Sequence, residues 1–131
     1  MNLLLDTHVW LWSVMERQRL SREVARELEK SAQHVWLSPI SLWEVQTLVE
    51  RKKLHFKEGV RAWLSQAVDL TAPREAALTI EVARDLADFE LPHRDPADKF
   101  LVATARVYDL TLVTADERII NSKACRVLAN R

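Results

Sequence analysis

Acidic residues follow two of the buried strands that the sequence predicts. Asp6 comes directly after the apolar run Leu3–Leu5, and Asp116 follows the run Leu110–Val113 after two intervening residues. The carboxyl ends of parallel strands meet at one edge of a sheet, so both carboxylates are expected at that edge. A single aspartate after a strand is more often the cap of the next helix, whereas two at matched strand ends favour a functional site.

Three more acids are expected near the same edge. Glu44 lies early in a helix that Ser38 should cap, although a glutamate facing solvent is the simpler interpretation of this residue alone. Asp95 fits the N-cap of a later helix, and that capping role explains it well. Asp98 lies on the apolar stripe of the same helix, where a carboxylate without a partner is costly.

These acids together would form a group of converging carboxylates, which repel one another unless a cation lies among them. Oxygen ligands favour hard divalent ions such as Mg²⁺ or Mn²⁺ over zinc, and such ions commonly serve phosphodiester chemistry. The chain has one glycine, Gly59, and one cysteine, Cys125. This excludes Gly-rich Walker A and dinucleotide loops, disulfide scaffolds and cysteine-based zinc sites.

The elements that must position these acids alternate along the chain. Short apolar runs and helical patterns follow one another in the order typical of βαβ units, which predicts a three-layer α/β/α sandwich around a central, mostly parallel sheet of four or five strands. The expected strands are residues 3–5, 35–37, 67–70, 110–113 and 127–128. The expected helices are residues 8–15, 22–32, 39–50, 58–66, 73–86 and 96–108, with Thr71 capping the fifth. In the first helix, Val9, Trp12 and Met15 should share one face.

The composition fits one globular domain spanning residues 1–131. Hydrophobic residues make up 48% of the chain, and 19 basic residues balance 19 acidic ones. A zero net charge removes the simplest argument for nucleic-acid binding, a strongly basic chain, but does not say where the charges lie. No apolar run approaches the roughly 20 residues of a membrane span, and no signal peptide is evident, so no membrane contact and a cytoplasmic location are expected.

Four stretches of the chain occur in the order and spacing of a known family. They are LLLDTHVWLW (3–12), SPISLWEV (38–45), HRDPADKFLVATA (93–105) and LVTADERI (112–119). With them the chain resembles the PIN-domain ribonucleases and, among these, the VapC-type toxins of bacterial type II toxin–antitoxin modules. The resemblance covers essentially the whole chain. It implies a metal-dependent endoribonuclease that is inhibited by a cognate antitoxin protein and forms homodimers.

The resemblance also implies which residues form the site. The catalytic and metal-binding residues of the family fall on Asp6, Glu44, Asp98 and Asp116, with Asp95 and Thr114 as additional candidates. In the implied mechanism Asp6 is the central Mg²⁺ or Mn²⁺ ligand, and Asp98 and Asp116 assist it. Glu44 binds metal or orients the attacking water, and hydrolysis of the RNA phosphodiester leaves a 5′-phosphate and a 3′-hydroxyl.

Basic residues near the acidic motifs are candidates for contacts with the RNA backbone. Arg94, Lys99 and Arg118 flank those motifs directly. Lys52 and Lys53 belong to a second basic segment, residues 51–61, for which a solvated helix end and loop is the favoured alternative.

Two histidines also adjoin the acidic motifs. His8 follows Asp6, and His93 precedes Asp95, by two residues each. Because an oxygen-rich Mg²⁺ site rarely recruits imidazole, both are expected to be structural or to face the substrate.

Two other classes of protein compete with a ribonuclease. A receiver-type signalling domain has a similar length and a parallel sheet with aspartates at its strand ends. It needs a phosphoacceptor aspartate after its middle strand and a lysine after its last strand. Here the expected middle strand contains Asp69 internally, and no lysine follows Val113. The second alternative is a PIN module that binds a partner without catalysis, which the intact set of acids disfavours.

Overall fold

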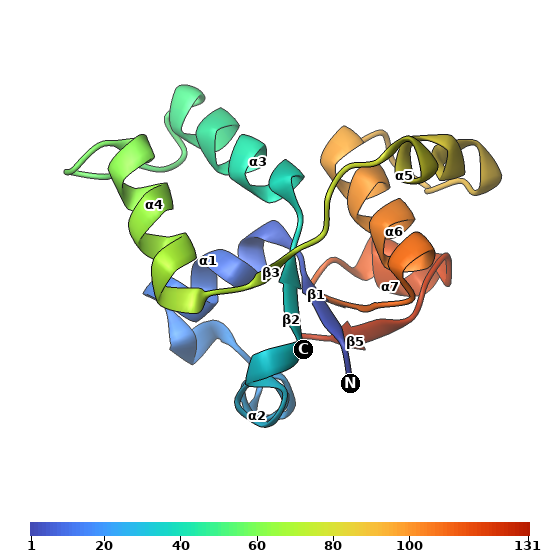
Figure 1. Ribbon diagram of the computed structural model, residues 1–131, viewed down its shortest axis with the longest axis horizontal. Coiled ribbons are helices and arrows are strands. Elements are labelled where there is room, and N and C mark those ends of the chain that lie inside the picture. The colour runs from blue at the N-terminus through green and yellow to red at the C-terminus, as the bar shows by residue number, and fades with distance from the viewer.

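The computed structural model describes residues 1–131 and contains a five-stranded parallel sheet between two layers of helices (Figure 1). The strands are β1 (Leu3–Leu5), β2 (Val35–Leu37), β3 (Arg74–Glu75), β4 (Thr111–Thr114) and β5 (Val127–Ala129). They lie in the order β3-β2-β1-β4-β5, and every neighbouring pair is parallel. The predicted α/β/α sandwich is therefore confirmed.

Seven α-helices and three short 3₁₀ turns connect the strands. The helices are α1 (Thr7–Met15), α2 (Arg22–Lys30), α3 (Pro39–Glu50), α4 (Val60–Thr71), α5 (Ile80–Asp85), α6 (Pro96–Tyr108) and α7 (Glu117–Ser122). Helices α1, α3 and α4 lie on one side of the sheet, and α5, α6 and α7 lie on the other (Figure 1). None of these helices combines the length and the apolar character that crossing a bilayer requires.

The sheet separates two hydrophobic cores because side chains alternate along each strand. In β1, Leu3 and Leu5 pack into the core beneath α1, whereas Leu4 packs into the core beneath α6. In β4, Val113 belongs to the first core and Leu112 to the second. Full burial of each such side chain contributes roughly 1.5–3 kcal/mol, which holds the strand ends firmly in place.

The carboxyl ends of three strands each lead into a capped helix at one edge of the sheet. Asp6 follows β1 and caps α1, where its Oδ1 accepts from the Val9 amide at 2.8 Å. Ser38 follows β2 and caps α3, and Asp116 follows β4 and caps α7. Capping and site formation are therefore compatible roles, since a cap at a strand's carboxyl end lies at the edge where ligands bind.

Residues 67–86 differ from the sequence prediction. The segment 67–70 was expected to form a strand, but it continues α4 to Thr71, and the actual strand β3 has only two residues. The apolar spacing explains the difference, because Ala67 joins Trp63 and Leu64 on one buried helical face. The predicted cap at Thr71 is also wrong, since Thr79 caps α5 instead.

The predicted face of α1 is also wrong. Val9 is buried as expected, but its buried neighbours are Trp10 and Leu11, while Met15 is 41% exposed. The packing of α1 between the sheet and α4 explains this pattern. The Trp10 ring meets Trp63 edge-on, with 5.6 Å between ring centroids. Burial on more than one side does not leave the single apolar stripe that a surface helix shows.

Candidate active site

A cavity of about 260 Å³ opens at the carboxyl edge of the sheet. Its lining contains the four predicted acids and the additional candidate Asp95, together with a single arginine. The lining residues are Asp6, Thr7, His8, Trp12, Glu44, Asp95, Asp98, Ala115, Asp116 and Arg118. The acids come from separate parts of the chain, after β1, on α3, at the start of α6 and after β4. The fold thus brings together what the sequence keeps far apart.

Asp6 is the most buried acid of the cavity, with 7% of its surface exposed. Burial raises its pKa, although hydrogen bonds from Thr114 and the Val9 amide favour the ionised form. The Thr114 hydroxyl donates to Asp6 Oδ2 and accepts from the Asp116 amide at 3.1 Å. Thr114 therefore links the ends of β1 and β4 and orients the buried carboxylate.

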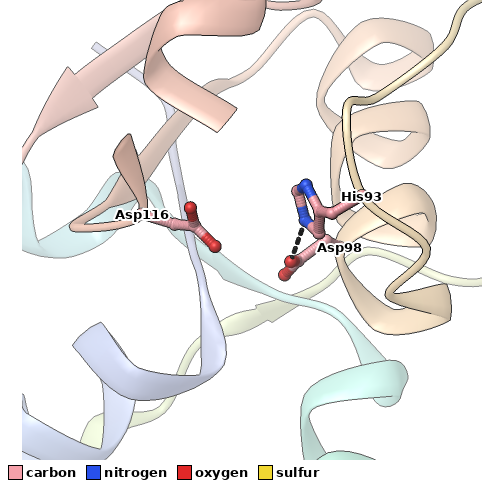
Figure 2. A group of neighbouring side chains, drawn as sticks. All are labelled: His93, Asp98 and Asp116. Carbon is pink, nitrogen blue, oxygen red and sulfur yellow. Dashed lines mark hydrogen bonds and ion pairs between the residues drawn. The ribbon is translucent and has the colours of Figure 1, made fainter. Parts of the chain in front are cut away.

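Asp98 projects from the first turn of α6 and contacts His93, which lies in the loop before that helix. The His93 Nε2 lies 2.7 Å from Asp98 Oδ2 (Figure 2). Burial raises the pKa of Asp98 to about 6, and the negative charges of Asp95 and Asp116 add to this effect. The hydrogen bond with His93 acts in the opposite direction.

Asp116 is the acid that a neighbouring cation neutralises. Burial by itself would raise its pKa, but the hydrogen bonds and charge of Arg118 outweigh burial, so that the pKa is lowered. The Arg118 guanidinium donates to both carboxylate oxygens, at 3.2 Å from Nε and 3.0 Å from Nη2. Asp116 is therefore ionised under ordinary conditions.

Glu44 and Asp95 complete the acidic lining. Burial raises the pKa of Glu44, and the charges of Asp95 and Asp6 add to the increase. Asp95 caps α6 as predicted, with its Oδ1 accepting from the Ala97 amide at 3.0 Å. The cap uses one carboxylate oxygen, and the other has no hydrogen-bond partner within the protein.

The arrangement suits a divalent cation. Five carboxylates line one cavity with one arginine, and the pKa of three of them is raised, mainly by burial. A bound cation would relieve both their repulsion and the cost of keeping them ionised. One ligand atom each from His93, Asp98 and Asp116 lies within 4.8 Å of the others, and Figure 2 shows the Asp116 carboxylate facing the His93–Asp98 pair.

The predicted basic residues occupy three different places. Arg118 lines the acidic cavity, whereas Arg94 and Lys99 line a separate cavity of about 540 Å³ that also contacts His93. Lys52 and Lys53 are exposed in the turn that follows α3, and neither lines the acidic cavity.

Three further residues near the site were not assigned to it from the sequence, and Trp12 was instead expected on the apolar face of α1. His8 and Trp12 line the cavity from α1, and their rings lie 6.0 Å apart. His93 was expected to be structural or substrate-facing, but its contact with Asp98 was not anticipated. Their positions offered a signal, because His8 and Trp12 follow Asp6 on the helix that it caps, and His93 immediately precedes the segment that opens α6.

Comparison with known proteins supports these observations. The family model described as PIN domain matches residues 3–124. Ribonuclease VapC22 from Mycobacterium tuberculosis (strain ATCC 25618 / H37Rv) is 33% identical over 120 residues, which cover 89% of this chain and 88% of that protein.

Similar solved structures share the fold at low sequence identity. The DNA-bound VapBC of Salmonella typhimurium has a TM-score of 0.76 at 15% identity, covering 100% of this chain and 99% of that chain. VapBC2 of Rickettsia felis, bound to a promoter DNA fragment, has a TM-score of 0.70 at 17% identity, with 98% of both chains covered. FitAcB of Neisseria gonorrhoeae has a TM-score of 0.70 at 21% identity, covering 98% and 97%.

Proposed function

Because the chain belongs to the PIN-domain family, we propose that it is a metal-dependent endoribonuclease and acts as the toxin of a toxin–antitoxin pair. The observation that carries the proposal is the cavity at the carboxyl edge of the sheet, where five carboxylates from separate elements meet one arginine. Membership of the PIN-domain family also excludes the alternative of a receiver-type signalling domain. If the chain were a PIN module that binds a partner without catalysis, it would cleave no RNA, and an RNA cleavage assay tests this alternative directly.

The donor set of the cavity fits Mg²⁺ or Mn²⁺ better than zinc, because carboxylate oxygens predominate and no cysteine is near. Asp6, Asp98 and Asp116 would hold the ion, with Glu44 as a further ligand or as the residue that orients water. Bound there, the ion supplies a water of lowered pKa and neutralises charge on the phosphate.

The chain's own residues prepare this chemistry. Thr114 and the Val9 amide hold the buried Asp6 carboxylate in one orientation. Arg118 holds Asp116 by two charge-assisted hydrogen bonds and brings positive charge to the cavity rim. Glu44, half-buried and with its pKa raised by burial, is suited to accept a proton from the attacking water.

Substrate RNA would approach along the basic residues next to the cavity. Arg94 and Lys99 line the neighbouring cavity, and Arg118 lines the acidic one. Positive charge at these positions offsets the repulsion between phosphate and carboxylates. Lys52 and Lys53 are separate from both cavities and are assigned no contact with the reacting phosphate.

The partners proposed for the chain follow from its relatives. Similar structures include DNA-bound VapBC complexes and FitAcB, and we infer that this chain is held by a cognate antitoxin protein. We also infer that residues 1–131 act as one PIN domain, that two copies form a homodimer, and that the protein works in the cytoplasm.

The proposal is tested by incubating the purified chain with single-stranded RNA and Mg²⁺ or Mn²⁺, with EDTA as the control. We expect cleavage only with metal, and new ends that carry a 5′-phosphate and a 3′-hydroxyl, because water rather than the RNA 2′-OH attacks. Ends that carry a 2′,3′-cyclic phosphate, or equal cleavage in EDTA, would contradict the mechanism. Growth arrest on expression, relieved by Asp6→Asn, would connect cleavage to toxicity.

A further inference from the structure

His93 is a buried histidine whose one hydrogen bond goes to a proposed metal ligand. Its side chain is 9% exposed, and the Asp98 side chain is 13% exposed. Nε2 of His93 lies 2.7 Å from Oδ2 of Asp98, and this is the hydrogen bond that the Asp98 carboxylate makes within the protein (Figure 2). A contact this short and this buried restricts both side chains.

The surroundings of the other ring nitrogen assign the tautomer of His93. Nδ1 is buried and has no hydrogen-bond partner. A proton on Nδ1 would be a buried donor without an acceptor, which is costly. The donor proton is therefore on Nε2, which donates to Asp98 Oδ2.

This hydrogen bond uses only one of the two oxygens of Asp98. The torsion that turns a carboxylate has broad, roughly twofold preferences, so an unrestrained Asp98 would sample many orientations. The bond from His93 fixes Oδ2 on the side of the loop before α6. Asp98 lines the acidic cavity, so its Oδ1 remains free for a ligand there.

We propose that His93 is a positioning residue that holds Asp98 in a metal-binding orientation without being a metal ligand itself. The inference rests on the metal site in the proposed function and adds a residue to it. Groups that orient ligating carboxylates through hydrogen bonds contribute substantially to metal affinity. His93 thereby prepares Asp98 as Thr114 prepares Asp6, in each case through a side-chain donor to Oδ2 of the buried carboxylate.

A matched pair of amide substitutions tests this role. The amide nitrogen of His93→Gln reaches about as far as Nε2, whereas His93→Asn carries the same group on a shorter side chain that stops near Nδ1. We expect His93→Asn to weaken Mn²⁺ binding by about 10–100-fold and His93→Gln to stay within about threefold of the unaltered protein. Mn²⁺ affinity of the full chain is measured from the EPR signal of the free ion.

Two controls make the result specific. His34→Gln alters an exposed histidine before β2, at the opposite edge of the sheet, and should leave Mn²⁺ affinity unchanged. Thermal unfolding in EDTA shows whether each variant is folded. If His93→Asn does not fold, His93→Gln still tests the positioning role. That role requires His93→Gln to bind Mn²⁺ with near-normal affinity, so a large loss of affinity in this variant would overturn it.

The outcomes separate this inference from the proposed function. Equal Mn²⁺ affinity of His93→Asn and the unaltered protein would overturn the role of His93 and leave the nuclease intact. Nitrogen coupling to bound Mn²⁺ in pulsed EPR, lost in His93→Gln, would make His93 a ligand and overturn the positioning role. If the unaltered protein binds neither Mn²⁺ nor Mg²⁺ and cleaves no RNA, the proposed function fails, and this inference fails with it.

Discussion

The acidic residues at the two edges of the sheet differ in how many of them have an arginine partner. At the amino edge, next to the starts of β4 and β5, a cavity of about 530 Å³ is lined by Glu81 and by two aspartates that each pair with an arginine. Arg106 Nε lies 2.8 Å from Asp85 Oδ2, and Arg126 Nη2 lies 2.7 Å from Asp109 Oδ1. Each of these two aspartates is neutralised by its own arginine.

At the carboxyl edge five acids share one arginine, and only Asp116 is paired with it. Burial raises the pKa of Asp6, Glu44 and Asp98, which means that the folded protein loses stability when these carboxyl groups are ionised. Four of the five carboxylates at the carboxyl edge have no arginine or lysine partner, which indicates a functional site there. We therefore expect replacement of an aspartate by asparagine to have different effects on cleavage and stability at the two edges.

The largest difference is expected in catalysis. Asp6→Asn and Asp98→Asn remove charge from the proposed metal site and should each lower metal-dependent RNA cleavage by at least about 100-fold. Asp109→Asn makes the same chemical change at the amino edge and should leave cleavage unaltered. Initial rates on one labelled RNA, at saturating Mn²⁺, measure the effect. Full activity in both carboxyl-edge variants would remove these residues from the site.

Divalent metal should stabilise the protein through the carboxyl edge alone. A cation that binds only the folded state adds about 2.7 kcal/mol at a concentration 100 times its dissociation constant. We expect Mg²⁺ or Mn²⁺ to raise the melting temperature of the unaltered protein and of Asp109→Asn, but to raise that of Asp98→Asn much less. Differential scanning fluorimetry in EDTA and in excess metal makes the measurement. An equal rise in all three proteins would place the ion elsewhere.

Without metal, neutralising an acid should have opposite signs at the two edges. Asp98→Asn removes a buried charge and should increase the free energy of unfolding at neutral pH by about 1–3 kcal/mol. Asp85→Asn breaks a partly exposed ion pair and should decrease it by up to about 1 kcal/mol. Urea unfolding in EDTA compares the two. Destabilisation by both substitutions would show that the carboxyl edge is satisfied without a cation.

The pH dependence of stability should also identify Asp98. Burial raises its pKa from 3.8 to about 6, so the folded state holds this proton more tightly than the unfolded chain does. The resulting stabilisation is complete below about pH 3.8 and is lost as the pH rises through about 6. In EDTA the unaltered protein should therefore lose stability relative to Asp98→Asn between about pH 5 and pH 7. A constant difference between the two unfolding free energies over this range would contradict the assignment.

The sequence predicted the elements at the carboxyl edge because two local signals agree there. Apolar runs predict β1, β2 and β4. The caps Asp6 and Ser38 mark the helices that follow β1 and β2, and Asp95 marks the start of α6, which carries Asp98. The segment from α4 to α5 differs from the prediction because Ala67 packs on a buried helical face, and over so short a run the apolar periodicity of a helix cannot be distinguished from that of a strand. Local pattern and tertiary burial disagree in that segment.

Some residues of the site could be predicted from the sequence, whereas their contacts became visible only in the structure. Strand-end positions predicted Asp6 and Asp116, and the resemblance supplied Glu44 as a site residue. The pairing of acids with cations depends on three-dimensional proximity, so neither the lack of an arginine or lysine partner at Asp98 nor its contact with His93 could be derived from spacing alone. The same holds for Arg118, whose guanidinium turns back onto Asp116.

The smallest expected effect concerns the basic residues around the acidic edge. Arg94 and Lys99 border it, whereas Lys52 and Lys53 lie in the exposed turn after α3. Each phosphate contact with single-stranded RNA contributes about 0.7 to the slope of log affinity against log salt. Replacing Arg94 and Lys99 by alanine should therefore reduce that slope by up to about 1.4, and replacing Lys52 and Lys53 should leave it unchanged. Fluorescence anisotropy with labelled RNA, on an Asp6→Asn background that prevents cleavage, measures both. A reduced slope for the Lys52 and Lys53 variant would extend the RNA path to that turn, because only lost phosphate contacts change the salt dependence in this way.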